Sequence, residues 1–282
     1  WDFGALGDSD MQNPTFTFDA AGTYTVTLIV SNDGGSDTIS HDITVEGGGM
    51  PTLDQLYFYP AAARAEGAAG SFFVTDAEIN NAGAEMATYQ FLWLPADTDN
   101  SAPTPSDMFT LEAGASVRYE DILGSVFGVP DGTNVTGGIA VASDSMDLLL
   151  FERIFNLGTE GTFGQAMPGF HQMDLIPENT RQRIVFFTQN DDYRSNLGFI
   201  NGVGMPIRVK WERFNADGSS IDTGFVDLAA WSWTQINTVF SDVAPVEAAY
   251  IDVWTETAGG YFMAYGSVLD QLTSDPTTVL PQ

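Results

Sequence analysis

Residues 22–45 read GTYTVTLIVSNDGGSDTISHDITV. Nearly every residue from 23 to 30 is β-branched or aromatic, which is the composition of a strand that packs one face against a core. The turn residues Asn-Asp-Gly-Gly at 32–35 separate this run from a second alternating run that contains Ile39, Ile43 and Val45. The pattern predicts two antiparallel strands joined by a tight turn.

The residues around this hairpin carry the motifs of one small domain family. In chain order the motifs are Trp1-Asp2-Phe3-Gly4, Asn13-Pro14, the run from Gly22 to Leu28, and Val30-Ser31-Asn32. Residues 1–46 therefore resemble the C-terminal half of a PKD domain, and the resemblance implies an immunoglobulin-like β-sandwich. One departure is Ala5-Leu6, which stands where the family usually has Asp-Gly.

Trp-Asp-Phe-Gly lies near the middle of a PKD domain, so the resemblance implies that residues 1–46 contain only part of a sandwich. We expect the apolar side chains of this segment to need cover, because an open sheet face and a free strand edge promote association. Two sources of the missing strands fit the sequence equally well. They either lie upstream of residue 1 or come from another chain.

The rest of the chain contains one order of predicted elements twice. Residues 73–81 and 193–201 are similar segments, and alternating strands follow each of them. We therefore predict a Gly-rich linker at 47–53, a β-sandwich unit at 54–156, a connection at 157–180 that packs between the units, and a second β-sandwich unit at 181–282. Both units resemble a repeat of uncharacterised exported bacterial proteins, a resemblance that implies no known activity. The predicted fold class is all-β, with tandem immunoglobulin-like sandwiches.

The composition excludes several classes of function. The net charge is 9 − 38 = −29, which disfavours nucleic acid, because Lys and Arg must neutralise phosphates there. The chain has no cysteine, so disulfides and thiolate metal sites are excluded. No apolar run reaches the length of about 18 to 20 residues that spans a bilayer, so we expect no direct membrane insertion. The acidity extends along the whole chain and suits an extracellular, salt-exposed surface.

We predict that the protein is not an enzyme. The two histidines, His41 and His171, are 130 positions apart, and no Gly-x-Ser-x-Gly motif lies near either of them. Pairs of carboxylates are abundant among 38 acidic residues, but the sequence places no pair across a cleft.

Calcium is the one cofactor that the sequence leaves open, because Asp and Asn side chains in loops supply the oxygen ligands that calcium prefers. No stretch matches the twelve-residue EF-hand pattern. The alternative is that these residues only stabilise turns with their own side chains. The candidate ligands are Asp97, Asp99, Asn100, Asp191 and Asp192.

Glycan is the one ligand class with candidate residues. Trp231 and Trp233 alternate in the sequence, so both project from one face of a strand and could form a stacking platform for sugars. The alternative is that both belong to a hydrophobic core, as buried Trp commonly does in sandwiches.

The function that we expect is that of a non-catalytic extracellular structural protein of a bacterial cell surface. The partial sandwich favours self-association or contact with neighbouring sandwich modules by β-strand complementation, which can propagate into a filament. The alternative function is a glycan-binding or adhesion accessory module of a larger secreted protein or enzyme.

Overall fold

Strands and turns account for nearly all of the regular structure of this chain. The computed structural model describes residues 1–16, 18, 22–45, 53–67, 70–158 and 161–282. The chain divides into two units, Trp1–Thr52 and Leu53–Gln282. The predicted all-β fold class is confirmed. The predicted linker at 47–53 lies outside the described residues, except for Leu53.

The N-terminal unit contains the predicted hairpin. A 3-10 helix, η1 (Gly4–Leu6), precedes strands β1 (Gly22–Asn32) and β2 (Gly35–Val45). The two strands pair antiparallel with Asn32 opposite Gly35, so Asp33 and Gly34 form the two-residue turn. Gly35 has a φ of 143°, a backbone conformation that favours glycine.

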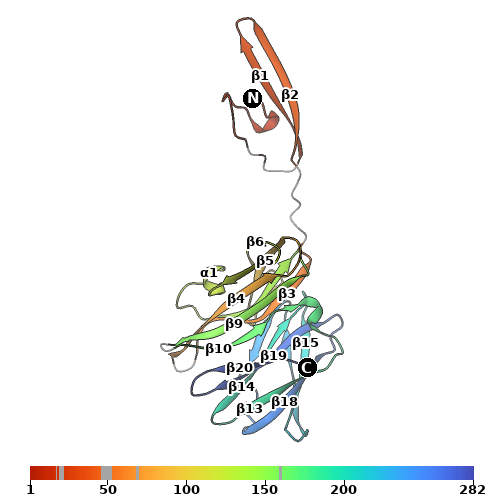
Figure 1. The fold of residues 1–282 in the computed structure, drawn as a ribbon. Helices are drawn as coiled ribbons and strands as arrows, with labels where there is room; N and C mark the ends of the chain where they lie inside the picture. The colour runs from red at the N-terminus through yellow and green to blue at the C-terminus, as the bar shows by residue number, and fades with distance from the viewer. Residues whose placement is uncertain (17, 19–21, 46–52, 68–69, 159–160) are drawn as a thin grey trace. The chain divides into compact units, whose positions relative to one another are not determined.

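The first sandwich lies within the second unit (Figure 1). One layer is β3-β8-β5-β6 and the other is β10-β9-β4 with β7 beside β4. Strand β3 contributes to both layers, because it pairs with β8 over most of its length and with β4 at Ala65 and Glu66. The strands are β3 (Gln55–Glu66), β4 (Phe72–Asn81), β5 (Ala87–Pro95), β6 (Thr104–Leu111), β7 (Ser116–Tyr119), β8 (Val135–Ser143), β9 (Leu148–Gly158) and β10 (Gly161–Pro168), with one helical turn, α1 (Ile122–Ser125).

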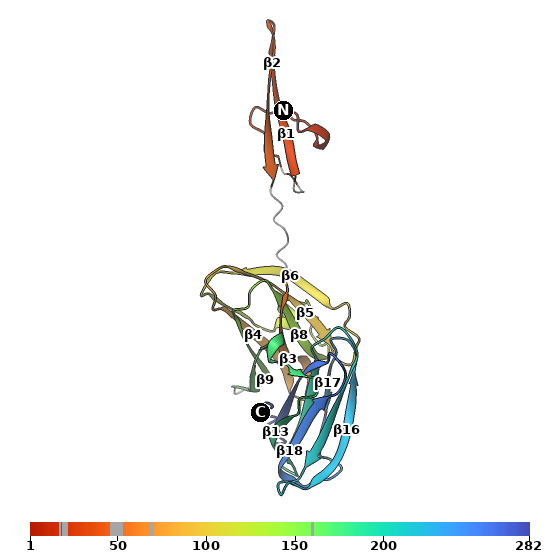
Figure 2. The ribbon, with the colours of Figure 1, turned by 90° about the vertical axis from the view of Figure 1, so that its right-hand side faces the viewer.

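The second sandwich follows the same order of strands. Its layers are β13-β18-β15-β16, visible in Figure 2, and β12-β19-β14-β17 with β20 beside β19. The strands are β12 (Ile176–Pro177), β13 (Gln182–Gln189), β14 (Tyr193–Asn201), β15 (Ile207–Phe214), β16 (Ser220–Leu228), β17 (Trp233–Ile236), β18 (Val246–Thr255), β19 (Tyr261–Asp270) and β20 (Pro276–Val279).

A buried asparagine ends the equivalent strand in each sandwich. Asn81 Nδ2 donates to the carbonyls of Glu85 and Leu111, and its Oδ1 accepts from Gly83 N. Asn201 makes the same three kinds of contact, to the carbonyls of Met205 and Ala229 and from Val203 N. Both side chains are fully buried, and they fix the turn after β4 and the turn after β14 in the same way.

The stretch predicted as a connection, 157–180, is largely strand, so that prediction is corrected. Strand β9 continues to Gly158, and β10 pairs with it from Gly161 to Pro168. Short strand β11 (Phe170–His171) then pairs with β3, and β12 pairs with β19. The sequence analysis did not predict a strand at 161–168, because Gly161 and Gly164 lie in it and glycine is a poor strand former.

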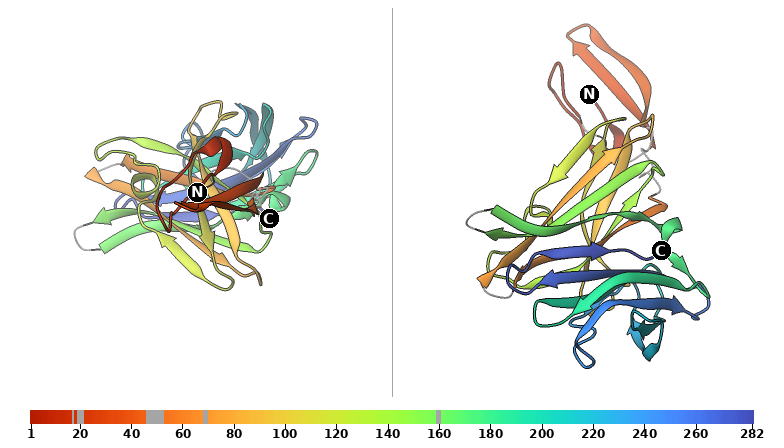
Figure 3. Two further views of the ribbon diagram at one scale, coloured as in Figure 1. Left: turned by 90° about the horizontal axis from the view of Figure 1, so that it is seen from above. Right: turned by 60° about the horizontal axis from the view of Figure 1, so that its bottom comes forward.

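The two sandwiches pack directly on each other. Each has its own hydrophobic core, and a third cluster joins residues of both, including Phe58, Met167, Ile200 and Trp233. Strand β10 of the first sandwich contacts β20 of the second, as Figure 3 shows. Gly138 permits close approach here, because a Cβ at that position would lie 2.6 Å from Ile200 Cδ1. Among the described residues, no helix is long and apolar enough to cross a bilayer.

Candidate functional site

One face of the N-terminal hairpin is mainly apolar and only partly covered. The register places Tyr24, Val26 and Leu28 of β1 on the same face as Ile39 and Ile43 of β2. The same face of β2 also carries His41, opposite Val26, and Asp37, opposite Val30. The opposite face is polar, with Thr25 Oγ1 donating to the Asp42 carboxylate at 2.6 Å. Strand alternation therefore separates the two kinds of side chain, as it does in a sheet that packs against a second layer.

Aromatic residues from the N-terminal segment cover one end of this apolar face. Phe3 stacks on Phe16 with ring centroids 4.0 Å apart, and Phe18 stacks on Tyr24 at 4.5 Å. Phe3 is buried. The same segment pairs with β1 through a single bridge between Asp2 and Thr27.

The end of the face nearest the turn is open. Ile39 is 68% exposed and Val30 is 54% exposed. Within the described residues, β2 pairs only with β1, so the outer edge of β2 has free backbone groups. An apolar face next to a free edge is a surface that can accept further strands.

Trp233 is buried at the junction of the two sandwiches, so an open Trp platform is ruled out. It is 6% exposed, and its Nε1 donates to Pro60 O at 2.7 Å. Trp231 is half-buried and stacks near Phe58, with ring centroids 6.1 Å apart. Both tryptophans thus belong to the contact between sandwiches, and the prediction that they form an exposed sugar platform is wrong.

The predicted calcium loop at 97–100 makes hydrogen bonds across the contact between the two sandwiches. Asp97 N donates to Trp233 O at 2.8 Å, and the Asp97 carboxylate accepts from Thr234 Oγ1. Asn100 Nδ2 donates to Trp231 O at 3.1 Å, and Asn100 is buried. Asp99 Oδ1 accepts from Ser101 N, as a turn-forming Asp does. The structure therefore places the predicted calcium loop beside the predicted glycan residues Trp231 and Trp233, where its hydrogen bonds link the two sandwiches.

The second calcium candidate also serves the loop in which it lies. The carbonyl of Asp191 accepts from Gln271 Nε2, and the carbonyl of Asp192 accepts from Gln271 N. In the part of the chain that the structure describes, no three His, Asp or Glu side chains gather in a group that could hold a metal ion. Calcium binding at Asp97, Asp99, Asn100, Asp191 or Asp192 has no geometric support here.

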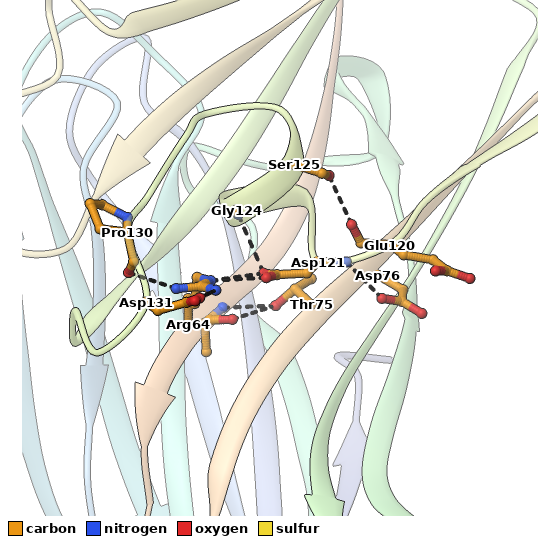
Figure 4. Close-up of polar contacts among 10 residues, drawn as sticks. Arg64, Thr75, Asp76, Glu120, Asp121, Gly124, Ser125, Pro130 and Asp131 are labelled. Atoms are coloured by element: carbon orange, nitrogen blue, oxygen red, sulfur yellow. Dashed lines mark hydrogen bonds and ion pairs between the residues drawn. The ribbon is translucent and has the colours of Figure 1, made fainter.

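A buried arginine holds the loop that closes each sandwich. Arg64 Nε donates to the Asp121 carboxylate at 2.9 Å and Arg64 Nη1 donates to Pro130 O at 2.6 Å, with Asp131 as a third partner (Figure 4). Figure 4 also shows Asp76 accepting from Asp121 N. These bonds hold the loop from α1 to β8 in place. Most of the acidic side chains in this cluster accept hydrogen bonds from the protein itself.

Arg213 has the equivalent role in the second sandwich. It is 3% exposed and donates to the carboxylates of Asp222 and Asp242 and to Val239 O. The Arg213 guanidinium holds the pKa of the Asp242 carboxyl below its usual range. Charge-assisted bonds of this kind are among the stronger polar contacts in proteins.

The outer face of the sheet β13-β18-β15-β16 carries stacked pairs of cationic and aromatic side chains. Every basic residue in these pairs also contacts a carboxylate, as Arg183 does with Asp252 at 2.7 Å. The guanidinium groups cover ring faces that could otherwise stack on a ligand. The pairs are Arg181 over Trp254 at 4.2 Å, Arg183 over Tyr250 at 4.1 Å and Arg208 over Phe225 at 3.9 Å.

The two histidines belong to different units of the chain. His171 Nε2 is 3.1 Å from Gln55 Oε1, and the ring packs edge-on against Tyr57. His41 is exposed on β2, opposite Val26.

Among the residues that the structure describes, Glu152 is the one acidic residue that is fully buried in the middle of a strand. It lies in β9, and its Oε1 accepts from Ala61 N at 3.2 Å, at the bulge where β3 loses register with β8. Among the described residues, Glu152 Oε2 has no hydrogen-bond partner. Burial raises the pKa of the Glu152 carboxyl well above its usual range. The isolated acid in the apolar run Leu-Leu-Leu-Phe-Glu at 148–152 is a sequence signal for such a group.

Replacing this carboxyl by an amide is expected to flatten the pH dependence of stability. Between the carboxyl pKa of the unfolded chain and the raised pKa of the folded chain, only the folded chain holds the proton. Stability therefore falls as pH rises through this window, by up to about 1.4 kcal/mol per pH unit, and the contribution is fully present below the lower pKa. The free energy of unfolding, measured with denaturant, should fall less between about pH 5 and about pH 8 for Glu152→Gln than for the natural chain.

The exposed Glu112 supplies the matched control, since Glu112→Gln changes the same group on the surface. We expect that variant to follow the natural chain. Parallel pH profiles for the natural chain and Glu152→Gln would contradict a buried, proton-holding carboxyl.

Comparison with known proteins adds a family for the N-terminal unit. Residues 1–46 match the PKD domain family. PKD domains typically occur in extracellular proteins, as adhesive or structural modules. No curated protein matches the sequence. The crystal structure of Thermotoga maritima 1070 is similar at a TM-score of 0.32 and 17% identity, over 41% of this chain and 92% of that chain, and a similarity this low carries no argument.

Proposed function

We propose that this chain is a non-catalytic structural subunit of an extracellular surface assembly, in which strands of a neighbouring chain complete the β1–β2 hairpin. The observation that carries the proposal is the open apolar face at Val30 and Ile39, beside the free edge of β2. The PKD match of residues 1–46 supports an extracellular structural module.

Addition of a strand would pair the free edge of β2 and cover the open apolar face of the hairpin. The free N–H and C=O groups of β2 would pair with the added strand, and its inward side chains would cover the apolar face. A contact between one surface and a different surface of the next chain can propagate into a filament when the rotation between subunits does not close a ring.

Charge makes this association dependent on salt. Residues 1–46 contain 0 basic and 8 acidic residues, so their net charge is 0 − 8 = −8. Repulsion between like-charged subunits is screened over about 10 Å at 0.1 M salt. We therefore expect assembly to strengthen as the salt concentration rises.

Placing a charge on the apolar face is expected to prevent assembly. In Val30→Asp the new carboxylate would lie opposite Asp37 and would have to be buried against the added strand, which costs several kcal/mol without a partner of opposite charge. Sedimentation velocity in salt should show large species for the natural chain and only the smallest species for this variant. Ile29→Asp is the matched control, because Ile29 is 55% exposed and lies on the opposite, polar face of the same strand.

Equal assembly of Val30→Asp and Ile29→Asp would contradict the proposal. The proposal would also be contradicted if the natural polypeptide stays monomeric because its own strands cover the open face at Val30 and Ile39.

A glycan-binding role is the second candidate. One observation favours it, which is an uncharged, mainly apolar cavity that Trp233 lines at the junction of the sandwiches.

A further inference from the structure

A cleft of about 630 Å³ opens at one end of the second sandwich. Phe186 and Thr188 of β13 line it from one layer, and Tyr193 of β14 and Val268 of β19 line it from the other. An apolar cavity of about 150 Å³ accommodates benzene, so this cleft has room for one or two six-membered rings with their substituents. Its volume also lies within the range of about 300 to 1,000 Å³ that small-molecule sites occupy.

The strand register directs the side chains of one wall into the cleft. Tyr193 lies opposite Asp270, and Val268 lies opposite Thr277. Residues that lie opposite each other, or two apart on one strand, share a face of the sheet. This face is the one from which Leu197 enters the core of the second sandwich. The cleft therefore continues the space between the two layers beyond the core.

Hydrogen bonds hold this end of the sandwich in place. Ser195 Oγ donates to Thr188 O at 2.6 Å, which joins β14 to β13. Gln271 N donates to Asp192 O at 2.8 Å, which ties the loop after β19 to the turn between β13 and β14. Asp270 Oδ1 accepts two backbone N–H groups of the same loop, both at 2.8 Å. The cleft is thus formed before a ligand binds, and a preformed site loses little free energy in ordering its groups.

Phe186 is held open to solvent by a strained backbone. It is 61% exposed, and its φ of 75° is a value that bulky residues rarely adopt. It stands where β13 loses register with β18, while its neighbour Phe187 is buried in the core. Strain of this kind persists where the surrounding structure enforces it, and it clusters at functional sites. With Tyr193, which is 41% exposed, Phe186 gives the cleft two accessible aromatic rings.

The polar groups of the cleft suit a ligand rich in hydroxyl groups. Hydroxyls both donate and accept, and four of them come from Thr188, Tyr193, Thr273 and Thr277. The carboxylates of Asp270 and Asp275 add acceptors, and among the described residues that line the cleft none is basic. An anion would therefore meet only like charge, whereas a simple cation would leave the hydroxyl donors unused. A sugar ring uses both its C–H faces and its hydroxyls in such a site.

We propose that this cleft binds an uncharged glycan, with one sugar ring packed on Phe186 and Tyr193 and its hydroxyls bonded to the threonine and aspartate side chains. The proposal gives the glycan-binding candidate function a site that opens to solvent. Because the cleft lies within the second unit, the proposal is independent of assembly through the β1–β2 hairpin.

Saturation-transfer NMR on the full chain tests the proposal with the methyl glycosides of glucose, galactose, mannose and N-acetylglucosamine. Each is used at about 10 mM, a concentration that detects Kd values in the millimolar range. We expect at least one glycoside to bind. Its Kd should rise about tenfold or more in Phe186→Gly and in Tyr193→Ala, because each substitution removes one aromatic ring.

Phe186→Gly separates an effect on binding from an effect on folding. Glycine adopts a positive φ without strain, and the side chain that is lost is mostly exposed. We therefore expect the midpoint of thermal unfolding to equal or exceed that of the natural chain while binding weakens. Phe225→Ala is the matched control, because Phe225 is 56% exposed on β16 of the same sandwich and does not line the cleft. It should leave the Kd unchanged.

Val30→Asp distinguishes a failure of this proposal from a failure of the assembly proposal. That variant should bind the glycoside as tightly as the natural chain does, whether or not the natural chain assembles. The glycan site is overturned if no glycoside binds the natural chain, or if folded Phe186→Gly and Tyr193→Ala bind as tightly as the natural chain. Binding of tetramethylammonium without any glycoside would identify a cation site and would equally overturn it.

Discussion

Trp233→Ala is expected to lower the free energy of unfolding by about 3 to 5 kcal/mol and to separate the unfolding of the two sandwiches. The side chain is buried in the cluster that joins them. Its removal leaves a cavity there and leaves Pro60 O without the hydrogen bond from Nε1. Calorimetry should show one transition for the natural second unit and two for the variant, because loss of the shared core weakens the coupling between sandwiches.

Trp254→Ala provides the control for the size of the side chain. Trp254 lies on the outer face of the second sandwich, and its Nε1 bonds to the exposed Glu256. For Trp254→Ala we expect a smaller loss of unfolding free energy than for Trp233→Ala, and the same number of calorimetric transitions as in the natural chain. A single transition of nearly unaltered midpoint in Trp233→Ala would mean that the sandwiches are not coupled through this residue.

Arg213→Met is expected to cost about 3 kcal/mol, the second largest loss among these variants. Methionine retains much of the apolar stem but leaves Val239 O and two carboxylates without their donor. The pKa of the Asp242 carboxyl is depressed by this arginine, so the stabilisation is present above the ordinary Asp pKa and is lost as pH falls through the depressed one. The difference between the natural chain and Arg213→Met should therefore narrow in acid.

Arg118→Met is the appropriate comparison, because Arg118 is exposed and its ion pair among the described residues is with Glu78. Surface pairs contribute about 0 to 1 kcal/mol, so its loss should be small. Equal effects of the two substitutions in denaturant unfolding would show that Arg213 does not hold the loop.

Local patterns predicted the parts of the fold that depend on local physics. Alternation and an Asp-Gly turn are sufficient for the β1–β2 hairpin, and the recurring order of strands predicted two sandwiches. The strand at 161–168 was missed, because its pairing with β9 is what makes a glycine-rich segment extended.

The candidate sites were harder to predict, because long-range contacts decide them. Alternation made Trp231 and Trp233 look like a platform, yet a partner at Pro60 places Trp233 inside the molecule. Asn100 looked like a calcium ligand, since the same side chains serve turns and cations, but it bonds to Trp231 O.

Electron microscopy of the native polypeptide, with and without a calcium chelator, tests the central claim most directly. We predict filaments with a regular repeat at physiological salt. Because strand addition is made by backbone hydrogen bonds and apolar contacts, we expect the filaments to survive chelation. Single compact particles under both conditions would contradict assembly through the β1–β2 hairpin.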